Sequence, residues 1–96
     1  MHLGEYQKLI EDIYYERDSG RGLEGTFLWF IEEVGELATA LREGDDASKH
    51  EEFADCLAWL TTLASLSGVR MEDVVSKYAG GWPRCRATPC SCPTKQ

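Results

Sequence analysis

Two short segments of the chain carry carboxylates at the spacing of one helical turn. The first, Glu-Glu-Val-Gly-Glu, ends at Glu36, and the second, Glu-Phe-Ala-Asp, begins at Glu52. Residues three or four positions apart share one face of a helix, so Glu33 lies beside Glu36. Glu52 and Asp55 are neighbours for the same reason. Four carboxylates at one interface repel each other unless a hard cation such as Mg2+ or Mn2+, which prefers oxygen ligands, lies between them. The spacing therefore predicts a divalent-cation site.

Helices are the elements expected to position these acids. Apolar residues that recur at three- and four-residue steps predict helices over residues 3–18, 26–43, 48–68 and 71–78. Thr26 is the expected N-cap of the second helix and Gly44 its stop, while Ser48 opens a capping box for the third. The glycine-rich stretch 18–25 is expected to be a flexible loop that could lie over a ligand. No strand pattern and no internal repeat is visible, so the fold class is all-α, a small four-helix bundle.

The helices are expected to pack through apolar stripes. In the third helix the stripe consists of Phe53, Cys56, Leu57, Leu60, Leu63 and Ala64, and in the second of Phe27, Phe30, Ile31, Val34, Leu37, Ala38 and Leu41. Trp29, Trp59 and Leu66 lie off these stripes, and the two indoles fall among the acids. Gly35 costs about 1 kcal/mol inside a helix, which the close approach of a backbone or a ligand would justify.

Length and charge narrow the possible partners. The chain has 96 residues, enough for one domain with a small core, so help from a partner chain is expected. The formal net charge of −7 argues against nucleic acid and anionic membranes as partners, because both are polyanions. There is no apolar run of membrane-spanning length and no signal-peptide pattern, so the cytoplasm is the expected compartment.

The acids and their surroundings resemble the MazG-like all-α nucleoside triphosphate pyrophosphohydrolases. The pattern of that family is E-E-x-x-E, a spacer and E-x-x-D, and here fifteen residues separate Glu36 from Glu52. The flanking letters E-E-V-G-E-L and E-F-A-D-C-L match as well, and the resemblance covers about residues 3–78.

This resemblance implies hydrolysis of (deoxy)nucleoside triphosphates to a nucleoside monophosphate and pyrophosphate, with Mg2+ as cofactor and nucleotide-pool sanitation as the role. By position in the motif, Glu32 corresponds to the residue that activates or positions the attacking water. The implied metal ligands are Glu33, Glu36, Glu52 and Asp55. The arrangement suits the chemistry, because metal ions neutralise triphosphate charge and a carboxylate takes a proton from water.

The resemblance also suggests substrate contacts and an assembly. Lys77 and Tyr78 match a Lys-aromatic pair near the end of the last helix, where the Lys would touch phosphate. Trp29 and Trp59 are candidates to stack on a base, although a core or interface role explains them equally well. Members of the family are typically dimers or dimers of dimers, so a homodimer or homotetramer is expected. The preferred base and sugar are left open.

The residues after the helices form a separate part of the chain. Residues 1–79 are expected to be the helical domain, and residues 80–96 a tail rich in glycine, proline and cysteine. Cys85, Cys90 and Cys92 could bind Zn2+, with a fourth ligand missing or supplied by another chain. A disordered tail with reduced thiols is the preferred interpretation, because structural zinc sites nearly always have four ligands.

Two other classes of function are compatible with parts of the sequence. A catalytically silent relative that binds metal or nucleotide would keep the helices, but all five acids are present here. A helical interaction protein with a solvated acidic face would need neither Gly35 nor two tryptophans among the acids. A ferritin-like di-iron site is disfavoured because neither helix carries the Glu-x-x-His pair.

Overall fold

The computed structural model describes residues 1–93, and every regular element among them is a helix. In chain order these are α1 (Leu3–Glu43), α2 (Asp46–Leu66), the short α3 (Met71–Val74) and the 3-10 turn η1 (Val75–Tyr78). The expected all-α class is confirmed, and the short final helix is present as α3 and η1. The last residues of the expected tail, 94–96, lie outside the described residues. Within residues 1–93 no helix combines the length and apolarity needed to cross a membrane.

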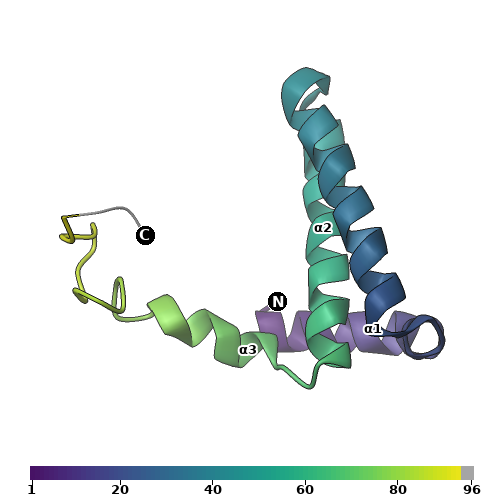
Figure 1. Ribbon diagram of the computed structural model, residues 1–96, viewed down its shortest axis with the longest axis horizontal. Coiled ribbons are helices and arrows are strands. Elements are labelled where there is room, and N and C mark those ends of the chain that lie inside the picture. Colours follow the sequence, from purple (N-terminus) through teal and green to yellow (C-terminus); the bar gives the residue numbers. More distant parts are fainter. Residues whose placement is uncertain (94–96) are drawn as a thin grey trace.

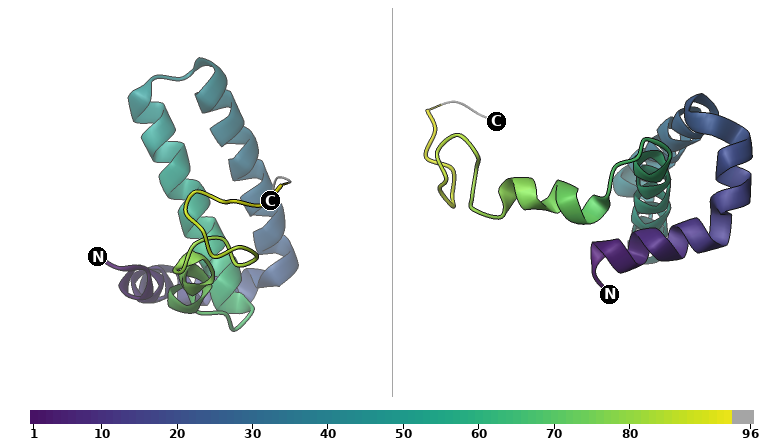
Figure 2. Two further views of the ribbon diagram at one scale, coloured as in Figure 1. Left: turned by 90° about the vertical axis from the view of Figure 1, so that its left-hand side faces the viewer. Right: turned by 90° about the horizontal axis from the view of Figure 1, so that it is seen from below.

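The first two predicted helices are one element with a sharp break. Residues on both sides of Gly22 are helical, whereas Gly22 has φ 82° and ψ 172°, a backbone conformation that is essentially confined to glycine. The part of α1 before the break lies across the lower end of α2, and the part after it runs alongside α2 (Figures 1 and 2). The predicted flexible loop at 18–25 is therefore wrong, because helix continues almost to the glycine from either side.

Buried polar side chains hold this break in place. The Thr26 hydroxyl donates to the Gly22 carbonyl oxygen at 2.7 Å, and the Arg21 guanidinium donates to the Asp18 carboxylate at 3.0 Å. The other oxygen of Asp18 accepts a hydrogen bond from Thr62 of α2 at 3.2 Å. Thr26 is thus an interior residue of α1 and not the predicted N-cap. Buried polar groups are tolerated only when they are hydrogen-bonded, so these contacts connect the break to α2.

A tight turn joins α1 to α2 and makes them antiparallel. Gly44 is the C-cap of α1, as predicted, and its N–H donates to the Ala40 carbonyl. The N-cap of α2 is Asp45, whose carboxylate accepts from the Ser48 N–H at 2.9 Å. The predicted capping box at Ser48 is therefore wrong, and α2 begins two residues earlier. An Asp at this position caps the helix as well as Ser would.

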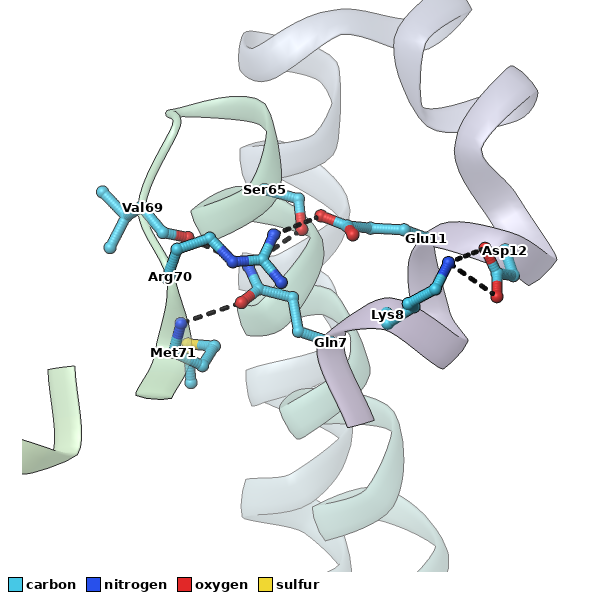
Figure 3. A network of polar contacts seen from close by, with 8 residues as sticks. All are labelled: Gln7, Lys8, Glu11, Asp12, Ser65, Val69, Arg70 and Met71. Carbon is cyan, nitrogen blue, oxygen red and sulfur yellow. Dashed lines mark hydrogen bonds and ion pairs between the residues drawn. The ribbon is translucent and has the colours of Figure 1, made fainter. Parts of the chain in front are cut away.

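Gln7 links the first part of α1 to the end of α2 and the start of α3. Its side-chain amide donates to the Ser65 hydroxyl at 3.0 Å and to the Val69 carbonyl at 2.9 Å. Its oxygen accepts from the Met71 N–H at 2.8 Å, and Figure 3 shows the side chain reaching between these partners. The Gln7 side chain is fully buried. Its side-chain hydrogen bonds therefore connect the N-terminal part of α1 to residues 65–71, where α2 ends and α3 begins.

The predicted apolar stripes are mostly not the core of the single chain. Phe27, Ile31 and Phe53 are 51%, 49% and 55% exposed, and Ile10, Ala40 and Met71 are the buried apolar residues of the described part. The radius of gyration, 15.8 Å, exceeds the ~12.5 Å expected for a compact domain of this length. Because α1 and α2 meet along a face with many polar residues, their apolar faces point outward and lack a partner within the chain.

Replacing Gln7 should test how strongly its network supports the fold. Gln7→Ala leaves the part-buried Val69 carbonyl and the buried Met71 N–H without partners, which should lower the free energy of unfolding by about 2–4 kcal/mol. Urea denaturation followed by circular dichroism measures this change. Lys8→Ala is the control: Lys8 makes only an exposed ion pair with Asp12, so its loss should cost less than about 0.5 kcal/mol. Equal effects of the two substitutions would contradict the role given to Gln7.

Candidate active site

Three of the predicted metal ligands converge between α1 and α2. The antiparallel arrangement of the two helices places Glu33 and Glu36 opposite Glu52. Each of these three residues contributes one carboxylate oxygen to a group of three, and these oxygens all lie within 4.8 Å of one another. Three acids at this spacing can reach one cation together. The structure thus brings together carboxylates that are sixteen or more positions apart across the turn.

We call Glu33, Glu36 and Glu52 the acidic cluster. Two of its carboxylate oxygens are buried and have no hydrogen-bonding partner among the described residues. Within residues 1–93, Oε2 of Glu33 and Oε2 of Glu52 are inaccessible to solvent and accept no hydrogen bond. Buried polar atoms are nearly always paired, so two such oxygens at one place indicate a missing ligand. A hard divalent cation, which takes carboxylate oxygens, fits this donor set.

Burial and neighbouring negative charges raise the pKa of two acids of this cluster, Glu33 and Glu52. Burial raises the pKa of Glu33 above its ordinary value, and the charges of Glu36, Asp55, Glu52 and, most weakly, Glu32 add to the effect. Partial burial likewise raises the pKa of Glu52, followed by the charge of Glu36 and Asp55. Both shifts have the sign expected when anions are crowded without a counterion. A bound cation would remove this repulsion.

The other two acids of the motif lie beside the cluster. Asp55 is half-buried, and its charge acts on Glu33 and Glu52, but it is not among the three acids that converge within 4.8 Å. Glu32 is exposed on the solvent side of α1. A position next to the metal ligands yet open to water suits a residue that handles water and not metal. The roles predicted for Asp55 and Glu32 stay predictions.

A cavity opens next to Asp55. It has a volume of about 190 Å3 and lies where the break in α1 faces α2. Its lining combines two arginines, two aspartates, two aromatic side chains, a threonine and an alanine: Tyr14, Arg17, Asp18, Arg21, Asp55, Ala58, Trp59 and Thr62. Cationic groups beside an acidic cluster can hold an anion that the metal also contacts.

Sequence reasoning missed the residues of α1 that line this cavity. Arg17 and Arg21 were assigned to the end of a helix and to a flexible loop, so their side chains were not placed. The signal was present, because two arginines four positions apart lie on one face if the helix continues. Which face of α2 they meet depends on the break at Gly22, which the sequence pattern did not reveal.

The two tryptophans that were candidates to stack on a base contact each other. Trp29 and Trp59 stack with ring centroids 6.2 Å apart and planes 14° from parallel. The Arg21 guanidinium carbon lies 4.8 Å from the centroid of Trp59, within the range of a cation-π contact. Trp29 is 47% exposed. The pair therefore connects the cavity to the surface.

Lys77 and Tyr78 do not reach the acidic cluster of their own chain. α3 and η1 extend away from the α1–α2 pair (Figures 1 and 2). The Lys77 ammonium lies 5.4 Å from the ring centroid of Tyr78 and 5.8 Å from that of Trp82. A phosphate contact from this segment would require a second chain.

The cysteines fall into two environments. Cys56 lies beside the acids, and burial together with their negative charge raises the pKa of its thiol. The other three, Cys85, Cys90 and Cys92, gather in the tail with sulfurs within 4.8 Å of one another. There the Ser91 N–H donates to the Cys85 sulfur and lowers the pKa of that thiol to about 6.

Gly35 has open space around it. No heavy atom of the described part of the chain, apart from its own helix and sequence neighbours, lies within 4 Å of the position a Cβ would take. The close approach expected at this glycine is therefore not made within the chain. A ligand or a second chain remains as the reason for a glycine here.

Comparison with known families identifies the chain. The family model for the MazG nucleotide pyrophosphohydrolase domain matches residues 21–80. This range is more than half of the chain and contains both carboxylate segments. The chain therefore belongs to the MazG nucleotide pyrophosphohydrolase domain family. A search of curated proteins gave no match.

The crowded acids should make the metal-free protein less stable as pH rises. Because the folded-state pKa of Glu33 and of Glu52 is raised above the ordinary value of 4.5, the folded state binds more protons than the unfolded state in that range. The free energy of unfolding in EDTA should therefore fall as pH increases from 4.5 through the raised pKa values. Thermal unfolding at a series of pH values measures this.

A matched pair of variants assigns the effect to the cluster. Glu33→Gln removes one of the crowded charges, so at neutral pH without metal it should be more stable than the parent protein. Mn2+ at 100 times its dissociation constant should stabilise the parent by about 2.7 kcal/mol and the variant by less. Glu24→Gln removes an exposed charge elsewhere on α1 and should change neither property. A Glu33→Gln protein that is destabilised in EDTA would contradict the repulsion described here.

Proposed function

We propose that this protein hydrolyses (deoxy)nucleoside triphosphates between the α- and β-phosphates, giving a nucleoside monophosphate and pyrophosphate. The observation that carries the proposal is the convergence of Glu33, Glu36 and Glu52, with two buried oxygens that lack partners, in a chain of the MazG family. The cavity beside these acids, whose lining includes Arg17 and Arg21, supports a phosphate-bearing substrate.

The acids would hold Mg2+, with Mn2+ as a possible substitute. Glu33, Glu36 and Glu52 supply oxygens from two helices, and Asp55 would complete the set at the edge of the cavity. When bound, the metal neutralises triphosphate charge and lowers the pKa of water. The chain itself carries a net charge of −7, so an anionic substrate needs such a counter-charge to approach the acids.

Glu32 would act as the general base. It is exposed and one position before a ligand, so its carboxylate can accept the proton of a water without taking part in the metal site. That water attacks the α-phosphorus and the bond to the bridging oxygen breaks, with pyrophosphate as the leaving group. Proton removal by a positioned side chain typically raises the rate by about 10²–10⁴-fold.

The cavity would receive other parts of the substrate. Arg17 and Arg21 offer positive charge one helical turn apart, and Arg21 is already oriented by Asp18. The Trp29–Trp59 pair offers an exposed aromatic face on which a base could stack. Lys77 and Tyr78 would contribute to the site of a second chain, because the α3–η1 segment that carries them extends away from α1 and α2. Removal of unwanted nucleotides from the cellular pool is the physiological role that fits such an activity.

A homodimer, or a pair of homodimers, is the proposed assembly. The accessible surface of one chain is 7107 Å2, against roughly 5,500 Å2 expected for a folded monomer of this mass. Large apolar side chains on α1 and α2 are exposed and contribute to this excess, including Phe27, Leu28, Ile31, Phe53 and Leu60. Their burial against a second chain would stabilise the fold and exclude water from the acids.

The purified protein with Mg2+ or Mn2+ should release pyrophosphate from at least one (deoxy)nucleoside triphosphate and not from the diphosphate. A panel of common and damaged nucleotides, with chromatographic separation of monophosphate and pyrophosphate, measures this. No turnover on any member of the panel with metal present would favour the catalytically silent relative over the enzyme.

Two variants should separate metal binding from proton transfer. Glu33→Gln should weaken Mn2+ binding more than about tenfold, because it removes a proposed direct ligand. Loss of a residue that only hydrogen-bonds to a ligand already lowers metal affinity by about 10–100-fold. Glu32→Gln should lower kcat by ~10²–10⁴-fold and keep Mn2+ affinity. Calorimetric titration and steady-state kinetics measure both, with Glu24→Gln as the matched control. If Glu32→Gln loses metal as strongly as Glu33→Gln, Glu32 is a ligand and not the base.

The assembly should be visible directly in solution. Light scattering coupled to size exclusion at micromolar concentration should give at least twice the chain mass of 10.8 kDa. Leu60→Glu places a charge on the exposed apolar face of α2 and should dissociate or unfold the assembly, whereas Lys8→Glu on the polar side should leave the mass unchanged. A stable, active monomer would contradict the proposal.

A further inference from the structure

The tail after η1 is a closed turn built around cysteines. The Arg86 N–H donates to the Trp82 carbonyl, and the Trp82 N–H donates to the Ala87 carbonyl at 3.3 Å. Gly81 has a positive φ of 93°, and a Cβ there would come within 2.9 Å of the Ala87 carbonyl oxygen. Trp82 also stacks on Tyr78, with ring centroids 5.6 Å apart. These contacts return the chain on itself and connect the turn to the last helical segment.

Three thiols, one within this turn and two after it, meet at the spacing of a metal site. The sulfurs of Cys85, Cys90 and Cys92 all lie within 4.8 Å of one another, and those of Cys85 and Cys90 are 3.8 Å apart. A tetrahedral zinc centre with bonds of about 2.3 Å places its sulfurs about 3.8 Å apart. A disulfide would require about 2.05 Å. The separation therefore matches two ligands of one metal ion and not a covalent pair.

Backbone amides face two of the sulfurs. The Ser91 N–H donates to Cys85 Sγ at 3.4 Å, and the Cys92 N–H donates to Cys90 Sγ at 3.4 Å. Hydrogen bonds of this kind stabilise the thiolate form and orient a ligand around its metal. The two donating N–H groups belong to the adjacent residues Ser91 and Cys92, so one short stretch of backbone supplies both hydrogen bonds.

The charge around the cluster also favours a bound cation. Three thiolates without a counterion would repel one another, as the acids of α1 and α2 do. Three thiolates with one Zn2+ carry a net charge of −1, and Arg84 and Arg86 flank Cys85 in the chain. Thiolate sulfur is a soft ligand that selects Zn2+ over Mg2+, so the two clusters differ in the metal they would take.

We propose that Cys85, Cys90 and Cys92 bind one Zn2+ per chain, with the fourth coordination position open to solvent. This replaces the preference for reduced, unstructured thiols that sequence reasoning gave. Cys90 is exposed, which leaves room for water or an external ligand at that position. The site lies beyond residues 21–80, the range that matches the family, and it does not depend on the proposed hydrolysis.

Metal analysis of the full chain tests the site. The protein is purified with a phosphine reductant and without chelator, treated with Zn2+, desalted and measured by mass spectrometry of its metals. About one Zn2+ per chain should remain bound. Cys90→Ser should lower Zn2+ affinity more than about 100-fold, because loss of an outer-shell partner alone costs 10–100-fold. Ser91→Ala keeps the backbone N–H and should retain the metal. Substitution with Co2+ should give thiolate-to-metal charge-transfer absorption that Cys90→Ser abolishes.

Two further measurements distinguish this site from the acidic cluster. Glu33→Gln combined with Glu36→Gln should leave bound Zn2+ unchanged, and loss of the zinc in that variant would overturn the proposal. Bound zinc should slow tryptic cleavage after Arg84 and Arg86 at least severalfold, and Cys90→Ser should abolish the protection. No retained zinc, no effect of Cys90→Ser, or a Cys85–Cys90 disulfide that persists in the presence of the phosphine reductant would each overturn it. Circular dichroism of each variant checks that the helices are intact.

Discussion

The arrangement of this protein depends on one backbone constraint, the positive φ of Gly22. This non-helical conformation interrupts the helix and changes its direction, and only glycine adopts it readily. The buried Asp18 and Thr26 satisfy the polar groups at the break, and Thr62 connects them to α2. The segment before Gly22 is then held against the far end of α2 by the hydrogen bonds of Gln7. The segment after it runs antiparallel to α2, and every contact of the acidic site follows from that direction.

The acidic site is arranged for a ligand that adds positive charge. Glu33, Glu36 and Glu52 are brought together at a cost, which is visible in the raised pKa of Glu33 and in two buried oxygens that have no partner. A helical pair would not hold such a cluster for stability alone, because crowded anions destabilise a fold. The same interface presents arginines from α1 to the cavity beside the acids. Membership of the MazG family implies a nucleotide substrate, and the crowded anions favour a cation at this interface.

The chain also has the properties of one part of a larger assembly. Its two long helices meet through many polar residues, whereas their apolar faces are about half exposed. The α3–η1 segment, which carries Lys77 and Tyr78, extends away from the α1–α2 pair. A second chain would bury the apolar faces and bring these residues toward a site. The cysteine turn is a separate feature at the end of the chain, with a ligand chemistry opposite to that of the acidic cluster, since soft sulfurs and hard oxygens select different metals.

The sequence by itself determined the parts of this protein that depend on local pattern. The all-α class, the stop at Gly44, the final short helix and the pairing of acids at helical spacing all follow from periodicity and from residue conformational preferences. The tertiary structure decided what depends on direction and distance. Only the break at Gly22 shows that residues 18–25 are mostly helical and that Arg17 and Arg21 face the cavity. Only the fold shows that the apolar stripes face outward, because periodicity identifies a face and not its partner. The meeting of Cys85, Cys90 and Cys92 likewise required the closed turn, whose hydrogen bonds no spacing rule predicts.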